Sequence, residues 1–345
     1  MTHNKSDKNV IDIKNVIHTN RITTVSTDCL SGSDRPKGRR HTRLTRVLAL
    51  LMTAILLSGL AACANPSQTT GPSPTKTTAK GTDDAETLYV TSVYPLYLAA
   101  AQIARDIPGV RVMNLTEEMT GCLHDYQLTT GNMKTLERAD VFIINGAGLE
   151  GYVDTVARDL PGLTVIEAAR GIPLIDENPH VWVSVSLMIR QVETIAAEMS
   201  RIDPSNKEAY ARNAQSYLDR LSALRQKMHA SVDPLPERRI ITVHEAFPYF
   251  AAEFDLEIAG VVEREPDSEP SAAELAATID LIRREKVKAV FAEPQYPSTA
   301  AQQIADESGA SLFLLDPVAS GDLKNLDAYL DIMEKNRLVL MEALK

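Results

Sequence analysis

Short runs of β-branched and apolar residues recur along the chain after residue 86, and helical patterns separate them. They form two sets of four. The first set spans residues 88–93, 110–115, 140–145 and 163–167, and the second spans 239–243, 257–262, 288–292 and 311–315. Strands that alternate with helices build parallel sheets, because the crossover helix returns the chain to the starting edge. The pattern therefore predicts an α/β protein with two parallel-sheet lobes.

Two amphipathic helices are predicted between the sets. The first is marked by Met188, Val192, Ile195 and Met199, and the second by Tyr210, Ala214, Tyr217, Leu221, Leu224 and Met228. Apolar residues at steps of three and four lie on one face of a helix. Asp203-Pro204 ends the first helix, and Asp233-Pro234 ends the second. The second helix would span roughly 40 Å, at 1.5 Å per residue. It either connects the two lobes or packs within one of them.

The N-terminal part of the chain reads as an export signal. Basic residues from Lys37 to Arg46 precede a 16-residue apolar run at 47–62, which is short for a membrane-spanning helix. The run ends Leu-Ala-Ala before Cys63, which resembles the lipobox of bacterial lipoproteins and implies cleavage and lipidation at Cys63. A signal-anchor helix with an incidental cysteine is the alternative. Residues 64–86 are rich in Ser, Thr, Pro and Gly, and we expect a flexible tether there.

The charge of the chain argues against a nucleic-acid partner. The full chain has 36 basic and 46 acidic side chains, and residues 1–62 hold 10 and 4 of these. Residues 63–345 are therefore strongly acidic, whereas phosphate binding needs a basic surface. An acidic surface suits a cationic ligand, although ordinary solubility explains it equally well.

Three of the four histidines after residue 62 lie where ligands bind in α/β proteins. His124 and His244 follow predicted strands of different lobes, and Asp316 follows the last strand. Ligands bind at the carboxyl ends of parallel strands. His180 precedes a helix, whereas His229 lies late in the long helix and is predicted to be a surface residue. Three imidazoles and a carboxylate suit Zn²⁺, which takes four N, S or O ligands.

Six short motifs occur in order between residue 88 and the C-terminus. They are 121–126 (GCLHDY), 145–150 (NGAGLE), 178–182 (NPHVW), 243–247 (VHEAF), 291–295 (FAEPQ) and 315–317 (LDP). Together they resemble the zinc/manganese solute-binding proteins of ABC transporters. The chain departs from many members in having Cys122-Leu123 before the first histidine, and in lacking a long His-rich loop at 170–177.

The resemblance implies two (β/α)4-type lobes joined by a single long helix, with metal in the cleft between them. The implied divisions are a signal region at 1–62, a tether at 63–86, an N-terminal lobe at 87–203, a linking helix at 204–232 and a C-terminal lobe at 233–345.

The resemblance also implies a set of metal ligands. His124, His180 and His244 would bind the metal, with Asp316 as the fourth ligand and Glu293 as its substitute. Histidine at the third position favours Zn²⁺, with Mn²⁺ as the alternative, because carboxylates shift the preference to harder ions. A thiolate of Cys122 is a further candidate.

The expected function is that of a receptor and not of an enzyme. The protein would be anchored by lipid at Cys63 on the extracytoplasmic face of the cell membrane, bind Zn²⁺ as a monomer and deliver it to a permease. A surface adhesin on the same scaffold remains open.

One motif favours another class of protein. Residues 146–151 fit G-x-G-x-x-G after a strand, and Glu167 lies about 20 residues on, as in a nucleotide-dependent oxidoreductase. The motif follows the third strand of its lobe and not the first, however, which favours a tight turn.

Overall fold

The computed structural model describes residues 86–116, 126–262 and 270–345, which all belong to one compact unit of the chain. Within these ranges no helix combines the length and the apolar character that crossing a membrane requires. The predicted signal region, the tether, Cys63, Cys122 and His124 lie outside the described residues.

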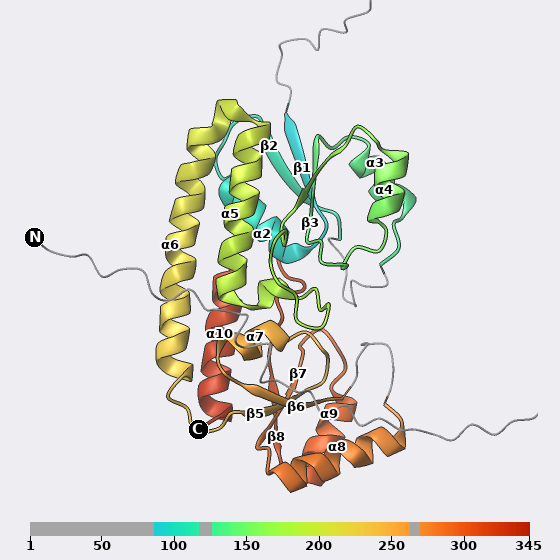
Figure 1. The fold of residues 1–345 in the computed structure, drawn as a ribbon, viewed down its shortest axis with the longest axis vertical. Helices are drawn as coiled ribbons and strands as arrows, with labels where there is room; N and C mark the ends of the chain where they lie inside the picture. Colours follow the sequence, from blue (N-terminus) through green and yellow to red (C-terminus); the bar gives the residue numbers. More distant parts are fainter. Residues whose placement is uncertain (1–85, 117–125, 263–269) are drawn as a thin grey trace, which may run out of the picture. The chain divides into compact units, whose positions relative to one another are not determined.

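Two four-stranded sheets form the framework (Figure 1). The first contains β1 (Thr87–Thr91), β2 (Val110–Asn114), β3 (Val141–Ile144) and β4 (Thr164–Glu167), in the order β2-β1-β3-β4. The second contains β5 (Arg239–Thr242), β6 (Glu257–Val261), β7 (Ala289–Ala292) and β8 (Ser311–Leu314), in the order β6-β5-β7-β8. Every pair of neighbouring strands in them is parallel. All eight predicted strands are thus present, and the predicted fold class is confirmed.

Helices cover both faces of each sheet. Those of the first lobe include α2 (Tyr94–Ile103), α3 (Thr130–Leu136) and α4 (Val153–Asp159), and those of the second are α7 (Pro248–Glu253), α8 (Ala272–Glu285), α9 (Thr299–Ser308) and α10 (Ala328–Ala343). Successive strand residues point to opposite faces. Val141 and Ile143 therefore pack in one core with α2, while Phe142 packs in another with α3 and α4. The two-sided burial explains why the strands are nearly continuous apolar runs.

The joint between the lobes is made of α5 (Val185–Ile202) and α6 (Lys207–Val232), which a short 3₁₀ turn at Pro204–Asn206 separates. All ten apolar residues that marked the two helices in the sequence are buried. The 26 residues of α6 pack along α5 and α2 of the first lobe and along α10 of the second. The alternative in which α6 stays within one lobe is therefore wrong.

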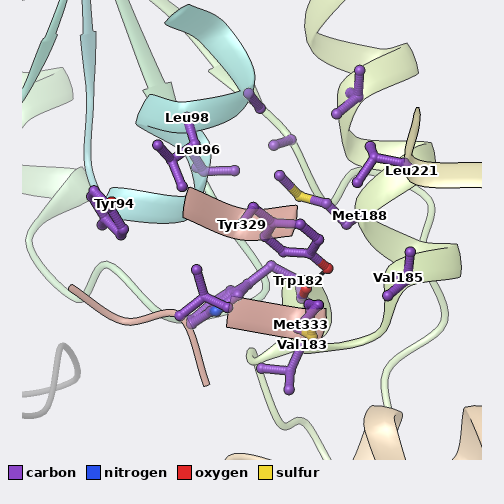
Figure 2. Packing of buried hydrophobic residues seen from close by; sticks show 14 of the residues in the cluster. Tyr94, Leu96, Leu98, Trp182, Val183, Val185, Met188, Leu221, Tyr329 and Met333 are labelled. Atoms are coloured by element: carbon purple, nitrogen blue, oxygen red, sulfur yellow. Dashed lines mark hydrogen bonds between the residues drawn. The ribbon is translucent and has the colours of Figure 1, made fainter. Parts of the chain in front are cut away.

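A single apolar core continues from one sheet to the other. Trp182, Met188 and Tyr329 lie at this junction and are fully buried (Figure 2). The indole of Trp182 donates to the carbonyl of Pro317 at 2.8 Å, and the Tyr329 hydroxyl donates to the carbonyl of Trp182 at 2.8 Å. Close-packed interiors resist deformation. The two lobes therefore share one close-packed core.

Candidate metal site

His180 lies in the loop that leads from the first lobe into a 3₁₀ turn, Val181–Val183. His180 is buried, with 5% of its surface exposed. The side-chain oxygen of Asn178 accepts from the His180 backbone N–H at 2.9 Å and contacts ring nitrogen Nδ1 at 3.0 Å. A backbone N–H can only donate, so the atom that contacts Nδ1 is the amide oxygen. The proton of the neutral ring is therefore assigned to Nδ1, and the lone pair that binds metals is on Nε2.

His244 follows β5 in the second lobe and is equally buried, at 5% exposure. Its Nδ1 lies 2.9 Å from the Oε1 atom of Glu293, which follows β7 and is 3% exposed. The carboxylate accepts a hydrogen bond from the Nδ1–H group, so the lone pair of this ring is again assigned to Nε2. Metal-binding histidines commonly have such a carboxylate partner, which orients the ring and raises its basicity.

The two imidazoles meet edge to face. Their ring centroids are 5.2 Å apart, with 88° between the ring planes. The Asn178 amide also donates to the carbonyl of Glu245 at 2.7 Å, and the Tyr249 hydroxyl donates to the Asn178 carbonyl at 2.6 Å. Asn178 therefore ties the loop that carries His180 to the loop that carries His244.

Asp316 lies in the adjoining loop after β8. Its Oδ1 atom accepts from the Gln295 amide at 2.8 Å and from the Val318 backbone N–H at 2.8 Å. Burial raises the pKa of this carboxyl. The next residue, Pro317, accepts from Trp182, whose ring centroid is 5.3 Å from that of His180. Asp316 is thus linked to the surroundings of the imidazole pair.

The described residues bring together only part of the predicted ligand set. His180, His244 and Glu293 are neighbours, but no three His, Cys, Asp or Glu side chains within these ranges are arranged to hold a metal ion. His124 lies outside the described residues.

Asn178 was not among the predicted site residues. A local pattern could have indicated it, because an Asn side chain readily bonds the backbone two residues further on.

The comparisons with known proteins identify the family. A family model described as zinc-uptake complex component A, periplasmic (ZnuA), matches residues 90–343. The chain belongs to this family. The high-affinity zinc uptake system protein ZnuA of Bacillus subtilis (strain 168) is 28% identical over 309 residues, which cover 83% of this chain and 96% of that protein.

Solved structures of similar proteins contain different metals. The structure titled SBP FpvC from Pseudomonas aeruginosa in complex with Ni²⁺ shares 33% identity with a TM-score of 0.68, covering 75% of this chain and 97% of that one. The same protein was also solved with Mn²⁺, at 34% identity, a TM-score of 0.68, and 75% and 98% coverage. The Zn(II)-bound ZnuA-like domain of Streptococcus pneumoniae AdcA is 26% identical, with a TM-score of 0.67 and 75% and 99% coverage.

In this member of the ZnuA family, a carboxylate of the chain itself fills the glycine-rich turn after β3. Glu150 accepts from the backbone N–H groups of Asn145 at 2.7 Å and Gly146 at 2.9 Å, and from the Ser92 hydroxyl at 2.6 Å. Such amides hold the pyrophosphate in dinucleotide-binding proteins. Because Glu150 already pairs with them, the turn is not arranged for a nucleotide.

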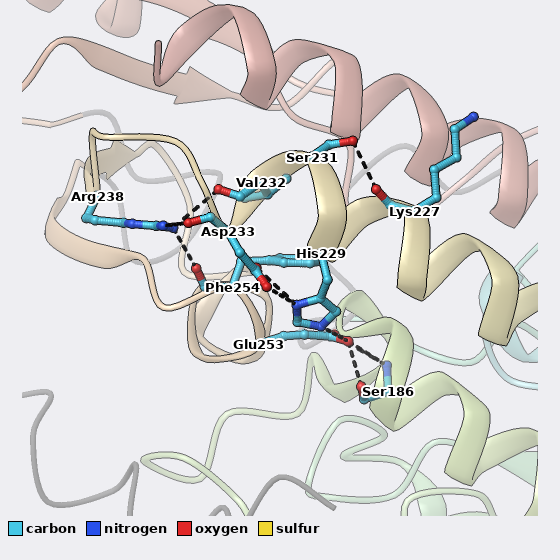
Figure 3. Close-up of polar contacts among 9 residues, drawn as sticks. All are labelled: Ser186, Lys227, His229, Ser231, Val232, Asp233, Arg238, Glu253 and Phe254. Atoms are coloured by element: carbon cyan, nitrogen blue, oxygen red, sulfur yellow. Dashed lines mark hydrogen bonds and ion pairs between the residues drawn. The ribbon is translucent and has the colours of Figure 1, made fainter. Parts of the chain in front are cut away.

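His229, which was predicted to be a surface residue, is partly exposed and partly covered. Its side chain is 29% exposed, and its ring lies 4.9 Å from that of Phe254 (Figure 3). Nδ1 contacts the Asp233 carboxylate at 3.0 Å, and Nε2 lies 3.8 Å from Oε1 of the buried Glu253. The residues that cover part of the ring, Glu253 and Phe254, lie at the end of α7.

Proposed function

We propose that the protein is the extracytoplasmic substrate-binding component of an ABC transporter, which binds Zn²⁺ between its lobes and delivers it to the permease. The observation that carries the proposal is the buried pair of His180 and His244. They come from different lobes, lie 5.2 Å apart by ring centroids, and both have Nδ1 paired with an acceptor. The pairing of both Nδ1 atoms leaves Nε2 of each ring as the nitrogen proposed to bind the metal, and family membership supports zinc uptake as the role.

The proposed ligands are His124, His180 and His244, with Asp316 as the fourth. The contact between Glu293 and His244 favours Glu293 as the partner that orients the ring, rather than as a substitute ligand. Asp316 is held through Oδ1 by two donors, which orients the carboxylate so that Oδ2 can serve as the metal-binding oxygen. Zinc sites of this type hold the ion in a tetrahedron of N and O donors.

The remaining parts of the proposal rest on the sequence. A lipid on Cys63 would anchor the protein on the extracytoplasmic face of the cell membrane, with 64–86 as a tether to a monomeric binding unit. Binding and release of an ion change no covalent bond of a substrate, so the protein would have no catalytic activity. Delivery requires the ion to leave when the protein contacts the permease.

Metal analysis of the purified protein tests the site. His124→Ala, His180→Ala and His244→Ala should each retain much less zinc than the wild type, because a site that loses one of four donors loses a large part of its binding free energy. Glu334→Gln is the control, since this side chain contacts Lys227 and Arg337 and lies outside the proposed site. Full zinc retention in all three ligand variants would refute the proposal.

Manganese is the second candidate, because FpvC, a similar protein, was solved with Mn²⁺. Three imidazoles favour Zn²⁺ over Mn²⁺, which binds most N/O sites more weakly and prefers oxygen donors. Competition between the two ions, followed through the fluorescence of the only tryptophan, Trp182, should show tighter binding of Zn²⁺. A higher affinity for Mn²⁺ would transfer the proposal to manganese transport.

A further inference from the structure

A buried carboxylate lies beyond the imidazole pair, at the start of α5. Glu253 is the last residue of α7, and its side chain is 1% exposed. It accepts from the hydroxyls of Ser184 and Ser186, both at 2.6 Å, and from the backbone N–H of Ser186 at 3.1 Å. Figure 3 shows Glu253 between Ser186 and His229. One carboxylate thus joins the second lobe to the first turn of α5.

This contact completes the N-terminus of α5. The first backbone N–H groups of a helix have no partner within the helix. Ser184 accepts from the backbone N–H of Leu187 at 3.2 Å, and Glu253 accepts from that of Ser186. The first turn of α5 contains no acidic residue, so Glu253 supplies the negative charge that stabilises the positive end of the helix dipole.

Glu253 also joins the two segments that lead away from the imidazoles. From His180 the chain passes through the fully buried Val181–Val183 turn to Ser184. From His244 it passes into α7, which ends at Glu253. Asn178 links the same loops on the other side through the carbonyl of Glu245. The imidazole pair is therefore held between two cross-links, and each cross-link connects one lobe to the other.

His229 extends this joint to α6. Its Nε2 lies 3.8 Å from Glu253, and the carboxylate of Glu253, followed by that of Asp233, raises the pKa of the imidazole. The other polar groups facing this cluster are the two serines of α5, Tyr329, whose pKa burial raises, and Arg238, which donates to the carbonyl of Phe254. When His229 is protonated, its charge offsets that of the Glu253 carboxylate.

We propose that Glu253 is a positioning residue for metal binding, which fixes the spacing between the His180 and His244 loops by holding α7 against the N-terminus of α5. Loss of this joint lets the loops separate and the ion escape faster. The inference rests on the proposed function, because it acts through the same two imidazoles.

The experiment measures zinc release from the full-length protein in detergent. An excess of chelator is mixed with the zinc-loaded protein, and Trp182 fluorescence follows the release. Glu253→Gln should release zinc about tenfold faster, in the range found for groups that support metal ligands. Ser186→Ala removes one partner of Glu253 and should give a smaller increase, which keeps the test valid if Glu253→Gln fails to fold. The absorption spectrum of bound Co²⁺ should shift in Glu253→Gln, because the imidazoles change position.

Glu334→Gln is the control variant. Glu334 of α10 contacts Lys227 of α6 at 2.7 Å and Arg337 of its own helix at 2.6 Å, so its loss weakens an interhelical contact that involves neither imidazole. This variant should release zinc like the wild type and leave the Co²⁺ spectrum unchanged. Unchanged release in both Glu253→Gln and Ser186→Ala would overturn the inference, and so would equal acceleration in Glu334→Gln. If the wild type and Glu334→Gln fail to bind zinc at all, the proposed function fails as well.

Discussion

The two lobes place a carboxylate at the same topological position, and each lobe uses it differently. In the first lobe, Glu150 follows β3 and accepts from two backbone amides and the hydroxyl of Ser92, which follows β1. In the second lobe, Glu293 follows β7 and contacts the ring of His244, which follows β5. The strand orders of the two sheets correspond, so both carboxylates lie where α/β folds bind ligands.

The difference shows that position alone does not make a binding site. The two backbone N–H groups and the Ser92 hydroxyl that contact Glu150 are satisfied by its carboxylate, which stabilises the turn. Glu293 instead orients an imidazole whose second nitrogen can bind a metal. The chemistry of the residue after the neighbouring strand, serine in one lobe and histidine in the other, decides between a structural and a functional role.

Removing the carboxylate of the first lobe should give the largest effect. Glu150→Ala leaves two backbone N–H groups and a hydroxyl without their buried acceptor, and each unsatisfied group costs about 1–3 kcal/mol. We expect the free energy of unfolding to fall by about 3 kcal/mol, as measured by urea denaturation of the apo protein. Zinc affinity, measured at a temperature where the variant is folded, should stay within about twofold of wild type. A large loss of zinc affinity would show that the turn contributes to the metal site, which would contradict a purely structural role for Glu150.

Acidification should weaken zinc binding. Neutral imidazoles with an ordinary pKa of about 6.5 bind metal, so zinc affinity should fall by about 50-fold between pH 7.5 and pH 6.0 if three of them are ligands. Burial raises the pKa of Glu150. The contribution of this shift to stability is therefore fully present below the unfolded pKa and is lost as the pH rises through the raised folded pKa, so acidification does not weaken the first lobe through Glu150. Chelator competition across this pH range measures the affinity, and urea denaturation of the apo protein measures the stability. A zinc affinity independent of pH would contradict imidazole ligation.

The strands and helices could be predicted from the sequence, because they depend on the local periodicity of apolar residues. The eight strands lie within two residues of their predicted bounds, because most of their residues are apolar and form short runs. The runs are clearest in β3 and β7, whose residues are all buried. The positions of His180 and His244 relative to the predicted elements also followed from the sequence. His180 precedes the predicted helix that became α5, and His244 follows the strand β5.

The contacts of Asn178 with Glu245 and of Glu253 with Ser184 were not predicted. They depend on which loops meet in space, and a contact between segments far apart in the sequence leaves no periodic pattern. The partial cover of His229 was not predicted for the same reason. Its position late in α6 could be predicted, but not that Glu253 and Phe254 lie beside its ring.

A conservative change in the second lobe should affect zinc and not stability. Glu293→Gln keeps the size of the side chain and replaces the charged acceptor of the His244 Nδ1 proton by a neutral one. The ring becomes less basic, and we expect zinc to bind about tenfold more weakly, with the midpoint of urea unfolding of the apo protein nearly unchanged. Isothermal titration with a competing chelator measures the change. If this variant loses stability as Glu150→Ala does while binding zinc normally, the two carboxylates have the same structural role.

The smallest effect concerns the glycine turn that holds Glu150, and two glycines of that turn provide a matched pair. Gly146 and Gly148 both have left-handed backbones, with φ of +76° and +82°. An alanine at either position pays about 1 kcal/mol for that conformation. A Cβ at Gly146 would also lie 2.3 Å from Cγ of Glu167, whereas a Cβ at Gly148 has no neighbour within 4 Å. Gly146→Ala should therefore lower the free energy of unfolding by about 1 kcal/mol more than Gly148→Ala does, because Glu167 must move. Urea denaturation of the two variants measures this difference, and zinc affinity should be the same in both. Equal losses of stability would mean that Glu167 moves without cost, and a difference in zinc affinity would show that the turn of the first lobe affects the metal site between the lobes.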